Sequence, residues 1–244
     1  MSYASRCAGA VLLTLALGLI APSVAQSEAE FDERIREYIL SNPEVIVEAI
    51  QLWQQQQQQA EAQQYQNALR RLHDELYNTP DTPMLGNPDG DVAIIEFVDY
   101  NCGYCRRVFN DLMALTESDN QVKILMKEFP ILGADSLVAS QAALAAQRQG
   151  QYAALHTALM QARGALNENR VLSIAQDIGL DVEQLQLDMH DPAITATLQR
   201  NQMLAQQLGI NGTPGFIIGE EIVRGAVSVS QLQQLVAAAR DNDG

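Results

Sequence analysis

The sequence is poor in basic residues, and this scarcity excludes one large class of partners. Its 244 residues include 15 Lys and Arg against 30 Asp and Glu, a formal net charge of −15. Nucleic acid is not an expected partner, because phosphate binding needs clustered basic side chains. The 47% of apolar and 18% of charged residues are nevertheless a globular balance, so the chain can bury a core.

Long apolar runs are also missing, except at the start of the chain. Arg6 precedes the apolar run 8–21, and the small residues Ser23 and Ala25 follow it at the positions that a signal peptidase inspects. We therefore predict a signal peptide over 1–25, cleaved after Ala25, and export. An uncleaved membrane anchor is the alternative. A lipoprotein is disfavoured because Cys7 lies before the apolar run.

Cysteine is scarce, and cleavage would leave only Cys102 and Cys105. A bridge between residues so close in sequence closes almost no loop and stabilises little. The exported chain thus has no disulfide framework, and the two cysteines are expected to be chemically reactive rather than structural. A metal site would need two more ligands, but His73, His156 and His190 lack ligand spacing to the pair or to one another. We expect neither a metal nor another cofactor.

Residues 26–80 are expected to form a helical arm. Phe31, Ile35 and Tyr38 recur at helical spacing, and the segment 41–44, Ser-Asn-Pro-Glu, ends one helix and starts the next. The stretch 54–66 is rich in Gln and has almost nothing to bury. It is either a solvated connecting helix, a helix that packs against copies of itself, or a flexible spacer.

Turn-forming residues are concentrated in 78–90, where we place the boundary to a domain of residues 81–244. The apolar run 92–98 predicts a strand buried on both faces, and 106–115 has helical spacing. With a second strand predicted over 122–130, this is a βαβ unit with parallel strands.

The rest of the domain is expected to be mostly helical. Four or five helices fit between 135 and 208, forming an inserted helical domain at about 133–208. A hairpin is predicted from strands 215–218 and 221–223, followed by a final helix over 229–240. The predicted fold class is therefore α/β.

The two cysteines fall where a strand meets a helix, in the sequence Cys102-Gly103-Tyr104-Cys105. At the start of a helix, unpaired backbone N–H groups and the helix dipole favour the thiolate and lower the pKa of the first cysteine. Cys102 is then an exposed nucleophile and Cys105 the resolving thiol. Redox exchange through a mixed disulfide is the favoured interpretation, and a structural bridge is the alternative.

The segment 96–105, the helical block and Gly212-Thr213-Pro214-Gly215 together resemble the DsbA-like thiol-disulfide oxidoreductases of the thioredoxin superfamily. This resemblance covers the chain from about 91 onwards and implies a thioredoxin fold. It also implies a cis peptide bond before Pro214, with the backbone of Thr213 beside the cysteines to align a substrate strand. An ordinary trans turn proline is the alternative.

The same resemblance implies a buried acid at Glu96, behind the resolving cysteine, that relays a proton to or from Cys105. A solvated or ion-paired acid is the alternative. Gly103 and Tyr104, together with Thr213 and Pro214, are expected to contact substrate. Lys127 and Glu128 are candidates for the same site, whereas Phe97 and Tyr100 are expected in the core. His156 is expected to be a packing residue with its hydrogen bonds satisfied.

The arm around 38–46 resembles the amino-terminal segment of the suppressor-of-copper-sensitivity protein C type, in which this region can mediate trimer formation. This predicts a disulfide oxidoreductase acting on unfolded or mispaired exported proteins, served by a membrane redox partner. A homotrimer would favour isomerase over oxidase activity, because several active sites can hold one misfolded chain. The alternative is a non-catalytic holdase or a copper-binding thiol protein, since thiolates suit Cu(I).

Overall fold

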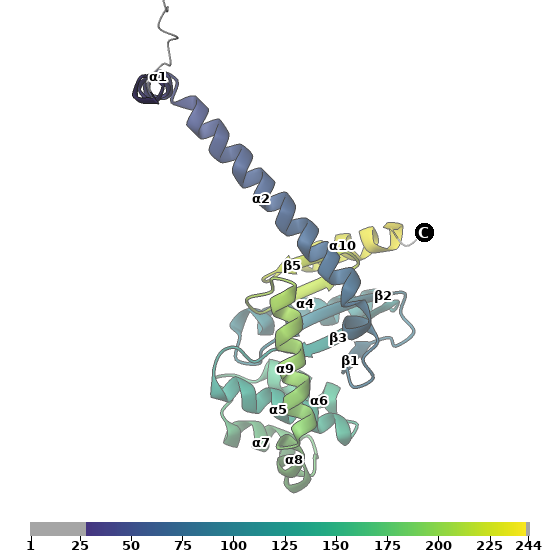
Figure 1. Cartoon of the computed structure of the whole chain (residues 1–244). Helices are drawn as coiled ribbons and strands as arrows, with labels where there is room; N and C mark the ends of the chain where they lie inside the picture. Colours follow the sequence, from purple (N-terminus) through teal and green to yellow (C-terminus); the bar gives the residue numbers. More distant parts are fainter. Residues whose placement is uncertain (1–27, 243–244) are drawn as a thin grey trace, which may run out of the picture. The chain divides into compact units, whose positions relative to one another are not determined.

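The computed structural model describes residues 28–242, and the chain forms two compact units that divide between Gln58 and Gln59. Figure 1 shows the elements along the chain. Their bounds are α1 (Glu28–Ser41), α2 (Glu44–Arg71), α3 (His73–Tyr77), β1 (Met84–Gly86), β2 (Val92–Val98), α4 (Gly103–Ser118), β3 (Val122–Glu128), α5 (Ala134–Arg148), α6 (Tyr152–Gln161), α7 (Glu168–Asp177), α8 (Val182–Met189), α9 (Pro192–Gln207), β4 (Gly215–Ile218), β5 (Glu221–Arg224) and α10 (Val229–Asn242).

The first unit contains α1 and the first half of α2. The predicted break between the two helices is confirmed, and the Asn42 side chain donates to the Tyr38 carbonyl at 2.8 Å to close α1. The Gln-rich stretch is helical throughout, so it is not an irregular spacer. Within this unit large apolar side chains remain exposed, among them Phe31, Tyr38 and Trp53.

The second unit is built on a five-stranded sheet in the order β1-β3-β2-β4-β5. The central strands β2 and β3 are parallel, as predicted, and the other pairs are antiparallel. Because successive side chains of a strand point to opposite faces, β2 and β3 serve two separate cores. Both strands are therefore apolar along nearly their whole length.

The two faces of this sheet are named here by the residues they carry. The cysteine face includes Ile94 and Val98 of β2, whose core also holds both cysteines. The lysine face includes Ile95 and Phe97, and its core is completed by the end of α2, by α3 and by the end of α9. The chain has only two lysines, Lys123 and Lys127. Each lies two positions from Leu125 of this core on β3, so all three side chains are on the same face of the sheet.

Residues 59–80 pack in the second unit, so the predicted arm 26–80 is divided between the two units. Leu69, Leu72 and Leu76 are buried against the lysine face. Tyr65 approaches the backbone at Gly209, which has a positive φ of 64°. Any side chain at position 209 would collide with the Tyr65 ring, so glycine is required there for close approach as well as for conformation.

Strand β1 was not predicted, since 78–90 was interpreted as turns. Its three residues pair antiparallel with β3 at the edge of the sheet. Only Leu85 of the three is buried. So short a strand gives no recognisable alternation of apolar residues among the flanking prolines and glycines, which are typical of turns. The edge strand forms because β3 offers unpaired backbone groups, which is a tertiary cause.

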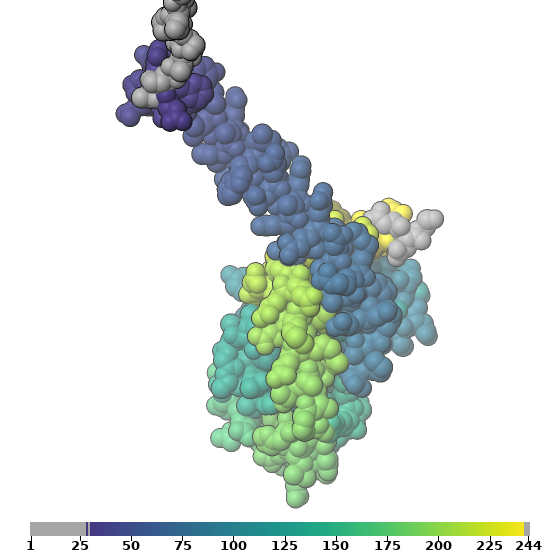
Figure 2. Space-filling view, in the orientation of Figure 1, coloured from purple at the N-terminus to yellow at the C-terminus, as the bar shows by residue number. Residues whose placement is uncertain are grey.

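The predicted helical block is confirmed and consists of α5 to α9. Its last helix, α9, runs along the outside of the second unit in yellow-green (Figure 2). Ile194 and Leu198 near its start join the core of the cysteine face, whereas Leu204 and Ala205 near its end join that of the lysine face. The helix thereby links the inserted block to both sides of the sheet.

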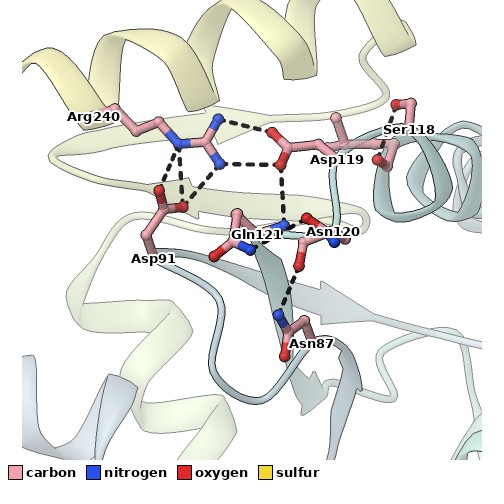
Figure 3. Close-up of polar contacts among 8 residues, drawn as sticks. Asn87, Asp91, Ser118, Asp119, Asn120, Gln121 and Arg240 are labelled. Carbon is pink, nitrogen blue, oxygen red and sulfur yellow. Dashed lines mark hydrogen bonds and ion pairs between the residues drawn. The ribbon is translucent and has the colours of Figure 1, made fainter.

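The last helix, α10, is tied to the amino-terminal end of β2 by a cluster of charges (Figure 3). Arg240 donates to both carboxylate oxygens of Asp91 and of Asp119 at 2.8–3.2 Å. Hydrogen bonds from the Arg240 guanidinium hold the pKa of both carboxyl groups below the ordinary value. Among residues 28–242, no helix combines the length and apolarity needed to cross a membrane.

Candidate functional site

The cysteine pair lies at the junction of β2 and α4, as predicted. Cys102 is the N-cap residue of α4 with extended backbone angles, and Cys105 lies in the first turn. The expectation that Cys102 is exposed is wrong, because only 6% of its surface is accessible. Thr213 covers it, and its carbonyl oxygen accepts a hydrogen bond from the Cys102 thiol at 3.2 Å.

The surroundings of Cys102 favour its thiolate and lower its pKa to about 5. The largest cause is a hydrogen bond from the Cys105 thiol, and partial burial opposes it. The Thr213 side chain and the backbone N–H groups of Cys105 and Tyr104 add further hydrogen bonds to the sulfur. These N–H groups belong to the first turn of α4, where they have no partner within the helix. These contacts together favour the thiolate form of Cys102 at neutral pH.

Cys105 is shifted in the opposite direction. Its pKa is raised far above the ordinary value, first because its thiol donates to Cys102, then because of burial and the charge of Glu96. None of its surface is exposed. Both cysteines are free thiols in this structure. One thiol poised as thiolate beside one held protonated is the asymmetry that a dithiol exchange site needs.

Thr213 and Pro214 are brought beside the cysteines from more than a hundred positions along the chain, and the peptide bond between them is cis. The trans alternative is therefore wrong. Strand β4 begins directly after Pro214 and pairs with β2 from Phe97 to Ile94. This pairing fixes the Thr213 carbonyl against Cys102.

Gly103 and Tyr104 are exposed beside the cysteines. No atom lies within 4 Å of where a Gly103 side chain would begin. Tyr104 is 57% exposed, and the Arg107 guanidinium lies 4.4 Å from its ring centroid. Ile131 and Leu132, which are also exposed, follow β3 and donate their backbone N–H groups to Asp99 at 2.9 and 3.0 Å.

Glu96 is buried, with 3% of its surface exposed, so it is not a solvated acid. It shares the cysteine face with Ile94 and Val98, as the strand alternation predicts. Burial is the first cause that raises its pKa to about 8, followed by the charges of Glu128 and Cys102. Glu96 therefore retains a proton near neutral pH, and once ionised its carboxylate raises the pKa of Cys105.

Lys127 does not belong to this site, which corrects its assignment as a candidate. It points to the opposite face of β3, where its ammonium donates to the Glu75 carbonyl at 3.1 Å and the Thr82 hydroxyl at 3.0 Å. Burial, with a contribution from Arg200, lowers its pKa to about 8. The pattern of alternation along β3 could have separated Lys127 from Glu128.

Glu128 lies on the cysteine face, fully buried, at the centre of a polar network. Its carboxylate accepts hydrogen bonds from Tyr100, Tyr152 and Ser140, each at 2.7 Å. The sequence analysis did not single out Tyr152 or Ser140, and it placed Tyr100 only in the core. No local motif joins these residues, because they come from the loop after β2, from α5 and from α6.

His156 is buried, as predicted, but its hydrogen bonds are not all satisfied. Its Nδ1 atom lies 2.9 Å from the Tyr100 hydroxyl, while Nε2 is buried without a hydrogen-bond partner among the described residues. Burial lowers its pKa to about 3, so the ring is neutral. Its ring packs against those of Tyr100, Phe109 and Tyr152.

Two residues just before the cysteines anchor the helical block, and the sequence analysis missed both roles. Asp99 accepts hydrogen bonds from the backbone N–H groups of Ile131 and Leu132, and it accepts another from the Ser136 hydroxyl of α5 at 2.7 Å. Asn101 accepts one from the backbone of Leu166 at 3.0 Å. Arg106 adds hydrogen bonds to the carbonyls of Tyr100, Ala162 and Gly164. The cysteine loop is thus fixed from the side of the inserted helices.

Residues 28–242 contain no group of three or more His, Cys, Asp or Glu side chains that could hold a metal ion. A pocket of about 500 Å³ lies on the lysine face, lined by residues that include Leu69, His73 and Val92. Val92 begins β2, whereas the cysteines follow its other end, about 20 Å away for a seven-residue strand. This pocket is therefore not part of the redox site.

Comparison with known proteins identifies related chains for both parts of the molecule. Residues 93–237 match the model of the DSBA-like thioredoxin domain, and residues 28–60 match that of the copper resistance protein ScsC N-terminal domain. A thioredoxin-like oxidoreductase from Silicibacter pomeroyi DSS-3 is 50% identical, covering 69% of this chain and 97% of that one, with a TM-score of 0.68. A linker-deletion mutant of Proteus mirabilis ScsC is 31% identical, covering 91% and 99%, with a TM-score of 0.70.

Among curated proteins, a Na(+)/H(+) antiporter NhaA of Herminiimonas arsenicoxydans is 25% identical over 158 residues, 64% of this chain. The chain spans only about a quarter of that relative's length. The predicted thioredoxin fold, with an inserted helical domain and a helical amino-terminal region, is confirmed. The family model covers more than half of the chain, and the chain therefore belongs to the DsbA-like family of thiol-disulfide oxidoreductases.

Proposed function

We propose that this protein is a periplasmic disulfide oxidoreductase that forms or isomerises disulfides in exported proteins, with isomerisation favoured. The observation that carries this proposal is the asymmetry of the pair: a Cys102 thiol with a pKa of about 5 beside a fully buried Cys105. Export rests on the predicted signal peptide, which lies outside the described residues. Periplasmic location is also stated for a related thioredoxin-like protein of Salmonella enterica serovar Typhimurium.

In isomerisation, the Cys102 thiolate attacks one sulfur of a wrongly paired disulfide. The substrate disulfide breaks, a mixed disulfide forms, and the second substrate sulfur leaves as a thiolate. That thiolate attacks another disulfide of the same chain. A later substrate thiolate then attacks the mixed disulfide and releases Cys102 as a thiolate, so no net oxidation occurs.

In oxidation, a substrate thiolate attacks Cys102 of the Cys102–Cys105 disulfide, and Cys105 leaves as a thiolate. We propose that Glu96 gives its proton to this sulfur. A second substrate thiolate attacks the mixed disulfide and releases Cys102, so the substrate loses two electrons and the cysteine pair gains them. A membrane redox partner would then reoxidise the pair.

Substrate binding is assigned to the surface around Cys102. The exposed ring of Tyr104, the open space at Gly103 and the exposed side chains of Ile131 and Leu132 form an apolar rim for an unfolded chain. Thr213 and Pro214 would align the substrate backbone. An apolar rim suits unfolded proteins, which expose the side chains that folded proteins bury.

Isomerisation is favoured because the amino-terminal unit has an apolar surface suited to self-association. Ile46, Ile50 and Trp53 recur at helical spacing on α2 and are 43–60% exposed. Contacts between such surfaces would assemble several active sites, in a homotrimer by analogy with the ScsC type. Assembly would raise the effective concentration of active sites around one misfolded chain.

The first test is reactivation of a substrate with scrambled disulfides in a glutathione buffer. The wild type should reactivate it, and Cys102→Ser should be at background. Activity that survives in Cys102→Ser would instead support a non-catalytic holdase. Binding of Cu(I) without any thiol exchange in the wild type would support a copper-binding thiol protein.

The second test separates isomerase from oxidase. Ile46→Asp with Ile50→Asp should dissociate the assembly and abolish reactivation, while oxidation of a reduced peptide continues. Glu48→Gln is the matched control, because Glu48 lies between these positions and points away from their stripe. If the wild type only oxidises peptides, or if the double variant still reactivates scrambled substrate, the isomerase assignment is wrong.

A further inference from the structure

The cysteine face carries a second buried acid that the proton relay described above does not use. Glu128 lies on β3, and Glu96 lies on the neighbouring parallel strand β2. In their register Glu96 is opposite Met126 and Val98 is opposite Glu128. The two acids are therefore diagonal neighbours on one face of the sheet, at a separation where unscreened charges interact strongly.

Glu128 has three hydroxyl donors that favour its carboxylate, whereas burial, the largest effect, raises its pKa to about 7. One of its oxygens accepts hydrogen bonds from the hydroxyl groups of Tyr100 and Tyr152, and the other accepts one from Ser140. Each of these hydrogen bonds is 2.7 Å long, and together they oppose the effect of burial on the Glu128 carboxyl. In addition, Asn201 of α9 donates its side-chain amide to the backbone carbonyl of Glu128 at 3.1 Å and holds this part of β3.

The groups around the two acids include no cation that pairs with either. Glu128 is surrounded by Asp99, Tyr100, Ser140, Tyr152 and the neutral His156. Glu96 faces Glu128 and the two cysteines. Lys127 points to the other face of β3, and no salt bridge to either acid occurs within residues 28–242. Negative charge on Glu128 is thus balanced only by hydroxyl dipoles.

We propose that Glu128 is a positioning residue for the redox pair: its hydroxyl-bonded carboxylate repels negative charge on Glu96 and so keeps Glu96 supplied with the proton that Cys105 exchanges. When Cys105 leaves the disulfide as a thiolate, the Glu96 carboxyl transfers its proton to that sulfur and becomes a carboxylate. When Cys105 resolves a mixed disulfide, its thiol returns the proton to Glu96 and the resulting thiolate attacks Cys102. The negative charge of Glu128 disfavours loss of the Glu96 proton to solvent, and it makes the Glu96 carboxylate a stronger base for the second transfer.

This inference rests on the proposed function, since it names a determinant of the same site. It also follows that two carboxylates so close do not titrate independently. Burial favours the proton on both acids, and the three hydroxyl donors oppose this effect at Glu128. The hydroxyl groups of Tyr100, Tyr152 and Ser140 therefore act on Cys105 through two carboxyl groups.

The test follows the resolution step directly. Cys102 is converted to a mixed disulfide with glutathione, and the rate of glutathione release by Cys105 is measured against pH in the full chain. Release needs a base to accept the Cys105 proton, so the profile reports the titration of Glu96. Glu128→Gln, which keeps the shape but removes the charge, should move the midpoint to lower pH by about one unit or more.

A matched pair of variants separates charge from packing. Ser140→Ala removes one donor from Glu128, raises the pKa of its carboxyl and should shift the profile in the same direction by a smaller amount. Thr82→Ala also removes a hydroxyl group that bonds to a buried charged side chain, but this hydroxyl accepts from Lys127 on the lysine face. It should leave the midpoint in place.

Each outcome bears on the proposal. If Glu128→Gln and Ser140→Ala leave the midpoint unchanged, or if Thr82→Ala shifts it as far as Ser140→Ala does, the role assigned to Glu128 is wrong. In either case a wild type that releases glutathione still supports the proposed function. If the wild type releases none at any pH, the proposed function itself fails.

Discussion

Both faces of the central sheet bury charged side chains, but they accommodate them in different ways. On the lysine face, the ammonium group of Lys127 has two dedicated acceptors, the Glu75 carbonyl and the Thr82 hydroxyl. On the cysteine face, Glu96 and Glu128 lie as neighbouring acids without a paired cation in the described part of the chain. A buried charge with its own acceptors holds elements together, whereas two adjacent acids leave one proton exchangeable beside a thiol.

The largest effect on the pH dependence of stability is expected when the exchangeable proton of Glu96 is removed. Folded Glu96 keeps its proton up to a pKa of about 8, against 4.5 in the unfolded chain. Between these pH values the folded state binds more protons, so stability falls as pH rises through this window. At 1.36 kcal/mol per pKa unit, Glu96→Gln should remove a pH-dependent loss on the order of 4 kcal/mol.

This prediction is measured by urea unfolding of the wild type and of Glu96→Gln at pH 5 and pH 8. The difference between the two proteins is the relevant quantity, because Cys102 titrates in the same range with the opposite sign. An equal pH dependence in both proteins would show that Glu96 is not held protonated by the fold.

Truncation of a side chain in the core of the lysine face should lower the free energy of unfolding as much as truncation in any domain interior. Leu76 is fully buried there, so Leu76→Ala should lower the free energy of unfolding by about 2–5 kcal/mol. Leu187→Ala, which truncates an exposed leucine of α8, is the control and should change it by less than about 0.5 kcal/mol. Chemical denaturation checks both, and similar values would mean that residues 59–80 do not stabilise the second unit.

The contribution of Lys127 to stability should depend on pH with the opposite sign to that of Glu96. Its pKa is about 8 in the folded state and 10.5 in the unfolded chain. Between these values the unfolded state binds more protons, so stability rises with pH. Lys127→Met should abolish this rise, which is on the order of 3 kcal/mol at 1.36 kcal/mol per pKa unit.

Unfolding at pH 8 and pH 10 measures this effect against the wild type. The pH profile of glutathione release should stay unchanged in Lys127→Met, because Lys127 faces away from the cysteines. A shifted release profile would mean that the two faces are electrostatically coupled.

The smallest effect is expected at the charge cluster of Figure 3, which belongs to neither face. Arg240→Gln should lower Tm slightly at pH 7, since the guanidinium is accessible and exposed ion pairs contribute little. The pKa values of Asp91 and Asp119 are lowered in the folded state. Their contribution is therefore present above the unfolded pKa and is lost as pH falls, so the two Tm values should converge in acid.

Several predictions made from sequence depended only on local patterns and proved correct. The apolar run of β2, the hairpin of β4 and β5, and the break between α1 and α2 were all placed from residue spacing. The position of Cys102 at the start of α4 followed in the same way. By contrast, β1 and the packing of Leu69, Leu72 and Leu76 on the sheet depend on partners far along the chain.

By itself, the sequence determined the order of the elements, the Cys-x-x-Cys pair at a helix start and the face on which Glu96 lies, because these follow from spacing within one segment. Only the tertiary structure decided that Thr213 covers Cys102, that Lys127 is turned away from the site, and that hydroxyl groups from three segments converge on Glu128. The physical reason is that burial and hydrogen-bond partners, which set these pKa values, come from segments that meet only when the chain folds.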